Sequence, residues 1–147
     1  MTAEIQRRVE LPDIPGDDEL QRFAAAVLDG TSQVNIRIVD EAEGRALNKC
    51  WRGKDCATNV LGFPADLPKE IQPPFLGDVV LCAPVIAREA REQGKPVEHH
   101  YAHLVIHGIL HLQGFDHIEA GGAEEMERRE RALLAGLGIP DPFESAA

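Results

Sequence analysis

Residues 103–117 read HLVIHGILHLQGFDH and contain four of the six histidines in the chain. His107 and His111 are four residues apart, a spacing that puts two side chains on one face of a helix, with Cβ atoms about 5–6 Å apart. Gly114 is a typical helix stop, and it would let the chain turn so that His117 returns toward the other two. The stretch therefore predicts three histidine ligands around one metal ion, with a fourth coordination position open as in catalytic sites.

The composition indicates a single globular domain over residues 1–147. With 44% hydrophobic residues, the chain is long enough to bury a hydrophobic core. Residues 1–30 hold no long apolar run, so we expect no secretory signal and no membrane partner. The three cysteines lack C-x-x-C spacing, which favours reduced thiols in a cytoplasmic protein.

The charge argues against broad binding to nucleic acid, because the formal net charge is −10. A local basic patch on an acidic body can still hold a phosphate. Arg52 and Lys54, with Lys49 nearby and Gly53 between them, form such a cluster. We expect this patch to contact substrate, and we expect no DNA partner.

The sequence pattern predicts both strands and helices. We expect four strands, at 4–9, 34–39, 58–64 and 75–82, of which 34–39 shows clear alternation of apolar residues. Helical spacing with start and stop signals indicates five helices, at about 17–28, 41–50, 84–93, 96–113 and 122–135. We expect a loop at 51–55 and a proline-rich loop at 64–74.

Two of these helices carry specific predictions about burial. The second should bury Ala46, Leu47 and Cys50, and the last should bury Met126, Ala132, Leu133 and Leu134. In the fourth helix the histidines fall on a narrow stripe apart from the core-facing residues. That core face is predicted to comprise Val97, Tyr101, Leu104, Val105, Gly108 and Leu112.

The histidines differ in what they are expected to do. For His99 and His100 an ordinary surface or core role is the better interpretation. His103 lies one turn before His107 and fits a substrate contact or a group that supports a ligand better than an alternate ligand. Three neutral imidazoles suit zinc first, with other divalent transition metals possible.

Hydrolysis is the natural reaction for such a site, and a metallopeptidase is one candidate. The spacing is close to the long zinc motif of metalloproteases, in which a glutamate follows the first histidine and acts as general base. Here Gly108 occupies that position and has no side chain to accept a proton. The peptidase interpretation is therefore the weaker one.

Other reactive groups give less specific signals. Asp116 either orients a ligand or forms the turn before His117. Glu124 and Glu125 fit a solvated acidic face, and Cys56, near Lys54, has no visible partner for nucleophilic catalysis.

The stretch HGILHLQGFDH, residues 107–117, resembles the signature of the YbeY family, bacterial endoribonucleases of ribosomal RNA maturation. The resemblance continues through further blocks in the family's order: LN at 47–48, WRGK at 51–54, TNVLGFP at 58–64, LGDVVL at 76–81, EEME at 124–127 and LGIPDPF at 137–143. Two departures are visible. Phe115 stands where the family usually has tyrosine, and Gly62 where it usually has serine, and neither is a proposed ligand.

This resemblance implies an α+β fold related to the zincins, with a small mixed sheet of about four strands packed by about five helices. It also implies cleavage of single-stranded RNA. It assigns the zinc ligands to His107, His111 and His117, and the functional arginine to Arg52. It further implies processing of the 3′ end of small-subunit rRNA and a role in ribosome quality control, with the small ribosomal subunit and its associated factors as partners.

We therefore predict a cytoplasmic, zinc-dependent endoribonuclease with one Zn²⁺ per chain. The catalytic residues would be Arg52 and the three ligands, and Lys54 and His103 would join Arg52 in binding substrate. Asp116 would support a ligand from outside the coordination sphere. Two alternatives remain open: a metallopeptidase, and a non-enzymatic ribosome-assembly factor whose structural metal would have a fourth protein ligand.

Overall fold

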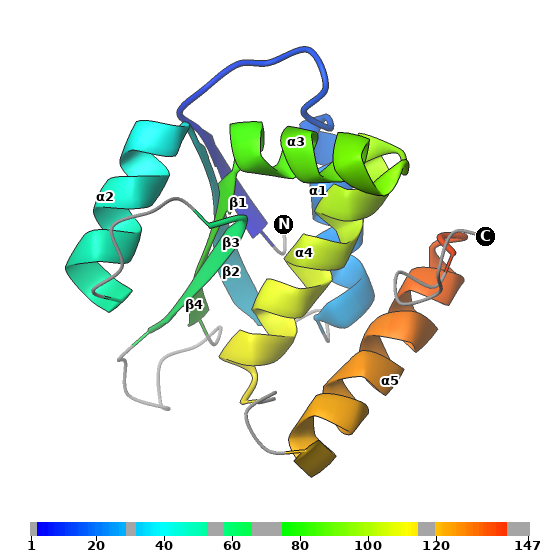
Figure 1. Ribbon diagram of the computed structural model, residues 1–147. Helices are drawn as coiled ribbons and strands as arrows, with labels where there is room; N and C mark the ends of the chain where they lie inside the picture. The colour runs from blue at the N-terminus through cyan, green and yellow to red at the C-terminus, as the bar shows by residue number, and fades with distance from the viewer. Residues whose placement is uncertain (1–2, 29–31, 53–57, 66–74, 115–119, 141–147) are drawn as a thin grey trace.

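The computed structural model describes residues 3–28, 32–52, 58–65, 75–114 and 120–140, with the side chains of 49–52 and 120–123 outside that description. Within these ranges the chain forms four strands and five helices (Figure 1). In chain order they are β1 (Ala3–Arg7), α1 (Asp17–Val27), β2 (Gln33–Val39), α2 (Glu41–Arg52), β3 (Val60–Pro64), β4 (Phe75–Cys82), α3 (Ala83–Gln93), α4 (Val97–Leu112) and α5 (Ala120–Gly136).

The strands form one mixed sheet in the order β1-β2-β4-β3. The pairs β1–β2 and β2–β4 are parallel, and β3 runs antiparallel to β4 at the edge of the sheet. Helix α2 lies on one side of the sheet, whereas α1, α4 and α5 lie on the other (Figure 1). The predicted α+β class and its small mixed sheet are confirmed.

The sheet buries both of its faces, because alternate residues of a strand point to opposite sides. Toward α1 and α4 the strands contribute Val34, Ile36, Ile38, Val79 and Leu81 to the main core. On the other side Val39, Val80 and Cys82 pack with Leu47 of α2 and with Phe63. Helix α4 lies against the first of these faces, so the sheet fixes its position.

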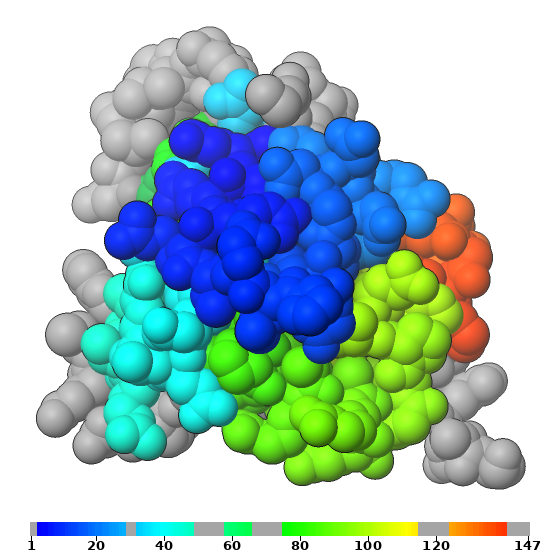
Figure 2. Space-filling view, turned by 90° about the horizontal axis from the view of Figure 1, so that it is seen from above, coloured from blue at the N-terminus to red at the C-terminus, as the bar shows by residue number. Residues whose placement is uncertain are grey.

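At the end of the molecule seen in Figure 2, the N-terminal residues, in blue, lie next to α2, in cyan, and α3, in green. Helix α4 begins beside α3 and runs away from this end (Figure 1). The C-terminal half of α4, which carries His107 and His111, therefore lies toward the opposite end of the molecule.

Helix α4 is more deeply buried than its sequence pattern predicts. The expected core residues Tyr101, Leu104 and Val105 are buried, but Ala102, Ile106, Ile109 and Leu110 are buried too. The reason is that the sheet, α1, α3 and α5 all pack around this helix. The helix ends as predicted: Gly114 follows it with a φ of 101°, a left-handed conformation that residues with a Cβ rarely adopt.

Three details differ from the sequence prediction. Helix α2 extends to Arg52, so the start of the expected loop at 51–55 is helical. Ala46 is exposed, and the helix buries Gly44 and Asn48 instead. In α5, Ala132 is exposed although Met126 and Leu134 are buried as expected.

Gly108 is required by close packing between α4 and the sheet. A Cβ built on Gly108 would lie 2.8 Å from Cγ1 of Val79 in β4, closer than two carbon atoms can approach. The position that holds the general base in metalloproteases therefore faces the sheet here and has no room for a side chain.

No helix within the described ranges is both long enough and apolar enough to cross a lipid bilayer.

Candidate metal centre

His103, His107 and His111 lie on successive turns of α4, as their spacing predicts. All three side chains are partly exposed, in a helix whose other residues are mostly buried. His111 lies against the edge strand: a Cβ on Gly62 of β3 would be 3.2 Å from Cδ2 of the His111 ring. The structure thus brings two of the three predicted ligands to one stretch of helix surface beside β3.

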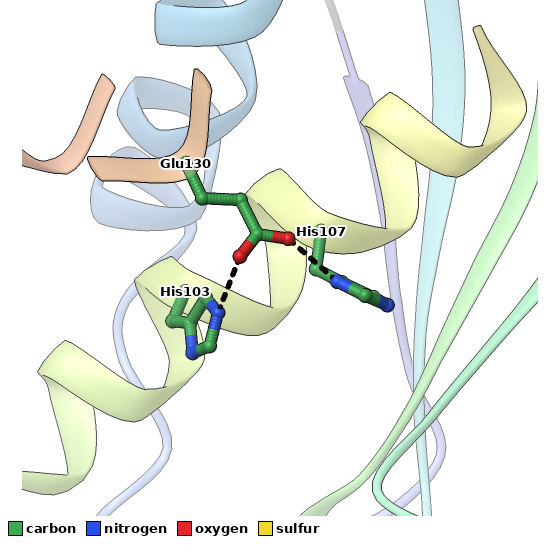
Figure 3. Close-up of side chains that lie close together, drawn as sticks. All are labelled: His103, His107 and Glu130. Carbon is green, nitrogen blue, oxygen red and sulfur yellow. Dashed lines mark hydrogen bonds and ion pairs between the residues drawn. The ribbon is translucent and has the colours of Figure 1, made fainter. Parts of the chain in front are cut away.

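A glutamate from α5 contacts two of these histidines (Figure 3). Oε1 of Glu130 lies 2.6 Å from Nδ1 of His107, and Oε2 lies 2.9 Å from Nε2 of His103. The Glu130 side chain is only 2% exposed, whereas that of His107 is 31% exposed. One buried carboxylate therefore spans two histidines one helical turn apart.

The ionisation of Glu130 determines which atoms donate. Burial alone would raise the pKa of Glu130, but the hydrogen bonds and the electrostatic attraction from His103 and His107 together outweigh burial and bring that pKa to about 2. An ionised carboxylate only accepts hydrogen bonds, so Nδ1 of His107 and Nε2 of His103 must each donate one. In a neutral His107 the lone pair is then on Nε2, which points away from Glu130 (Figure 3).

His103, His107 and Glu130 are also close enough to form a metal-binding group, since their ligand atoms lie within 4.8 Å of one another. A tetrahedral ion with ligand distances of about 2.0–2.1 Å holds its donor atoms about 3.3 Å apart. The contacts of 2.6 and 2.9 Å are shorter and match charge-assisted hydrogen bonds. The group as it stands is therefore hydrogen-bonded, and an ion at its centre would have to separate these atoms.

Other predicted site residues fall partly outside the described residues. His117 and Asp116 lie in 115–119 and Lys54 lies in 53–57, as does Cys56. Arg52 is the last residue of α2, and its side chain is not among those described.

His100 has the structural role expected from the sequence. Oε1 of Glu89 in α3 accepts hydrogen bonds from Nε2 of His100 and from Nδ2 of Asn59, both at 2.9 Å. Nδ1 of His100 is buried and has no hydrogen-bond partner among the described residues. Burial lowers the pKa of His100 from 6.5, and the bond to Glu89 offsets this only in part, so the ring stays neutral in the core.

Glu130 is the site residue that the sequence analysis missed. Its signal was nevertheless present, because Glu130 lies four residues after Met126 and four before Leu134, both of which are buried. An acidic residue on the apolar stripe of a helix needs a partner, since a carboxylate is costly to bury alone. By contrast, Glu124 is exposed as expected, and the half-exposed Glu125 pairs with Arg128 on the surface.

Comparisons with known proteins place this chain among close relatives. Residues 16–138 match a family model described as "Endoribonuclease YbeY". Proteins of that name from Stutzerimonas stutzeri and Pseudomonas fluorescens are 59% and 54% identical; the first alignment covers 88% of this chain and 83% of its relative, the second 97% and 96%. A solution structure from Thermotoga maritima superposes with a TM-score of 0.60 at 25% identity, covering 97% of this chain and 99% of that one.

Proposed function

The chain belongs to the YbeY endoribonuclease family, and from this premise we propose that it is a metal-dependent enzyme that hydrolyses phosphodiester bonds within single-stranded RNA. The observation that carries the metal dependence is the orientation of His107. Its Nδ1 donates to the buried Glu130, so its Nε2 points away from that residue as a metal-ligating nitrogen would.

The ligand set we propose is His107, His111 and His117. The first two are one helical turn apart on a partly exposed surface of α4, and the third follows the left-handed Gly114. Three imidazoles with an open fourth position suit one Zn²⁺ per chain, and other divalent transition metals would also be accepted. A bound ion would polarise a phosphoryl oxygen and make water a better nucleophile.

The chain's own residues would bind and orient the RNA. Arg52 can grip a phosphate oxygen through two parallel hydrogen bonds, and Lys54 adds a second positive charge nearby. His103, 16% exposed beside His107, would contact the substrate, and Asp116 would support a ligand.

The substrate we propose is ribosomal RNA at the 3′ end of the small subunit, during maturation and quality control in the cytoplasm. The net charge of −10 supports delivery by a partner, because an acidic body repels naked RNA. Proteins of the small subunit and its associated factors would bring the phosphates to the Arg52–Lys54 patch. Affinity for isolated RNA should accordingly be weak and fall with salt.

The two alternatives make different demands. A metallopeptidase needs a general base, and the space beside Gly108 is filled by Val79. An assembly factor with a structural metal would need a fourth protein ligand on the ion.

The test compares wild type with Arg52→Ala on single-stranded RNA, on a duplex of the same sequence and on casein. Wild type should cleave the single-stranded RNA but neither the duplex nor casein. The cleavage rate of Arg52→Ala should be lower by about 100-fold or more, with its metal content unchanged. Arg45→Ala, an exposed arginine on the same helix, is the matched control and should cleave like wild type. Hydrolysis of casein but not RNA would favour the peptidase, and metal uptake without any cleavage would favour the assembly factor.

A further inference from the structure

Glu130 lies in the middle of α5, where the helix packs on α4. One turn before it Met126 is buried, and one turn after it Leu134 is buried, and both belong to the main core. Packing on either side therefore fixes the backbone that carries the carboxylate. Because its backbone is fixed, the Glu130 carboxylate can fix the orientation of the side chains that bind to it.

Both carboxylate oxygens of Glu130 are engaged. His107 binds one oxygen and His103 binds the other, at 2.6 and 2.9 Å. The two rings lie nearly perpendicular, with an interplanar angle of 80° and centroids 6.3 Å apart, so the carboxylate is gripped from two directions. With both oxygens bound, the carboxylate cannot rotate without breaking a hydrogen bond.

We infer that Glu130 is a positioning residue for the metal centre: it holds His107 with Nδ1 toward α5 and Nε2 toward the ion, and it does not bind the ion itself. His103 is the second donor that fixes the carboxylate. This inference rests on the proposed function, since it needs His107 to be a ligand. His103 and Glu130 then support the ligand His107, and the three residues do not form a separate metal site.

The first experiment measures zinc affinity by competition with a chromophoric chelator. Glu130→Gln offers only one oxygen to two donors, so one histidine must turn or change tautomer, and we expect the Kd for zinc to rise about 10–100-fold. Glu127→Gln, a half-exposed glutamate one turn earlier in α5, is the matched control and should bind zinc like wild type. An unchanged Kd in Glu130→Gln would overturn the inference.

A second comparison separates a supporting group from a ligand. We expect His103→Ala to retain one equivalent of zinc with weakened affinity, and His111→Ala to lose it. If His103 and Glu130 were ligands, the outcome would be reversed, with His103→Ala losing the ion and His111→Ala keeping it. That reversed result would refute the inference.

The third measurement uses wild-type protein and so does not depend on any variant folding. Long-range ¹H–¹⁵N correlation spectra of the imidazoles report which ring nitrogen carries the proton. We expect a proton on Nδ1 of His107 both without zinc and with it; a deprotonated Nδ1 in either state would overturn the inference. Nδ1–H in a protein that takes up no zinc would refute the proposed function, whereas normal uptake with a deprotonated Nδ1 would refute only the role of Glu130.

Discussion

Three histidines of helix α4 contact a carboxylate, and two of these contacts, two helical turns apart, differ in their surroundings. At the N-terminal end of α4 His100 bonds Glu89 of α3, and further along His107 bonds Glu130 of α5. The His100 side chain is 5% exposed and its Nδ1 is buried, whereas the His107 side chain is 31% exposed and its Nε2 points away from Glu130. The same chemical pair therefore lies inside the core in one place and at a partly exposed surface in the other, and only there could the second nitrogen bind an ion.

The same substitution at both positions tests most strongly whether His100 and His107 have different roles. His107→Gln should lose its zinc and lower RNA cleavage by more than about 100-fold, because a bound ion supplies several kcal/mol of charge stabilisation. His100→Gln can still donate to Glu89, so it should keep the metal and cleave RNA like wild type. Metal content and initial cleavage rates measured side by side provide the check. Equal losses in the two variants would erase the distinction between the contacts.

The face of α4 turned toward the sheet gives a second, smaller effect on stability. Gly108→Ala would press a methyl group against Val79, and overpacking of this kind costs about 1–3 kcal/mol. Gly136→Ala is the control, because a Cβ there meets no atom within 4 Å. Urea unfolding should find Gly108→Ala the less stable of the two by about that amount. If both glycines tolerate alanine equally well, the packing argument against a catalytic side chain at position 108 is wrong.

The smallest expected effect is a pH dependence of the free energy of unfolding, which arises from the buried His100 beside Glu89. Because burial lowers the pKa of His100, the native state binds its proton less readily than the unfolded chain does. Stability should therefore fall as pH drops below about 6.5, by no more than about 1.4 kcal/mol per pH unit for one proton. Glu89, Lys95 and His103 are the charged or titratable groups that act on this ring.

Unfolding free energies of wild type and His100→Gln between pH 7 and pH 5 test this expectation. The wild-type protein should lose more stability over that interval than the variant, on the order of 1 kcal/mol. Parallel curves for the two proteins would show that His100 takes up its proton as easily when folded as when unfolded.

Sequence reasoning predicted the elements well because most of them show clear periodicity. The strand β2 alternates, and α1 and α3 have clear start and stop signals, so their positions followed directly. It failed where burial does not follow hydrophobicity. Gly44 is buried because it packs closely against Cys82: a Cβ on Gly44 would lie 3.2 Å from Sγ of that residue. The sequence does not show this, because a glycine adds nothing to an apolar pattern.

The sequence predicted those site residues whose arrangement depends on a single helix. The spacing of His107 and His111 is a property of one helix, and the structure brings them together as expected. Glu130 comes from a different helix, and its contact with His107 depends on how α5 packs on α4. The two residues are 23 apart in the sequence, and tertiary packing brings them into contact. Such a contact leaves no local sequence signal except a charge on an apolar stripe.

The central claim is that one ion held by the α4 histidines carries out RNA cleavage. Titrating zinc into chelator-stripped wild-type protein, while cleavage of a single-stranded RNA is followed, tests it most directly. We expect no cleavage without metal, then a linear rise that ends at one ion per chain. Full cleavage by the stripped protein, or a rise that continues well beyond one equivalent, would contradict it.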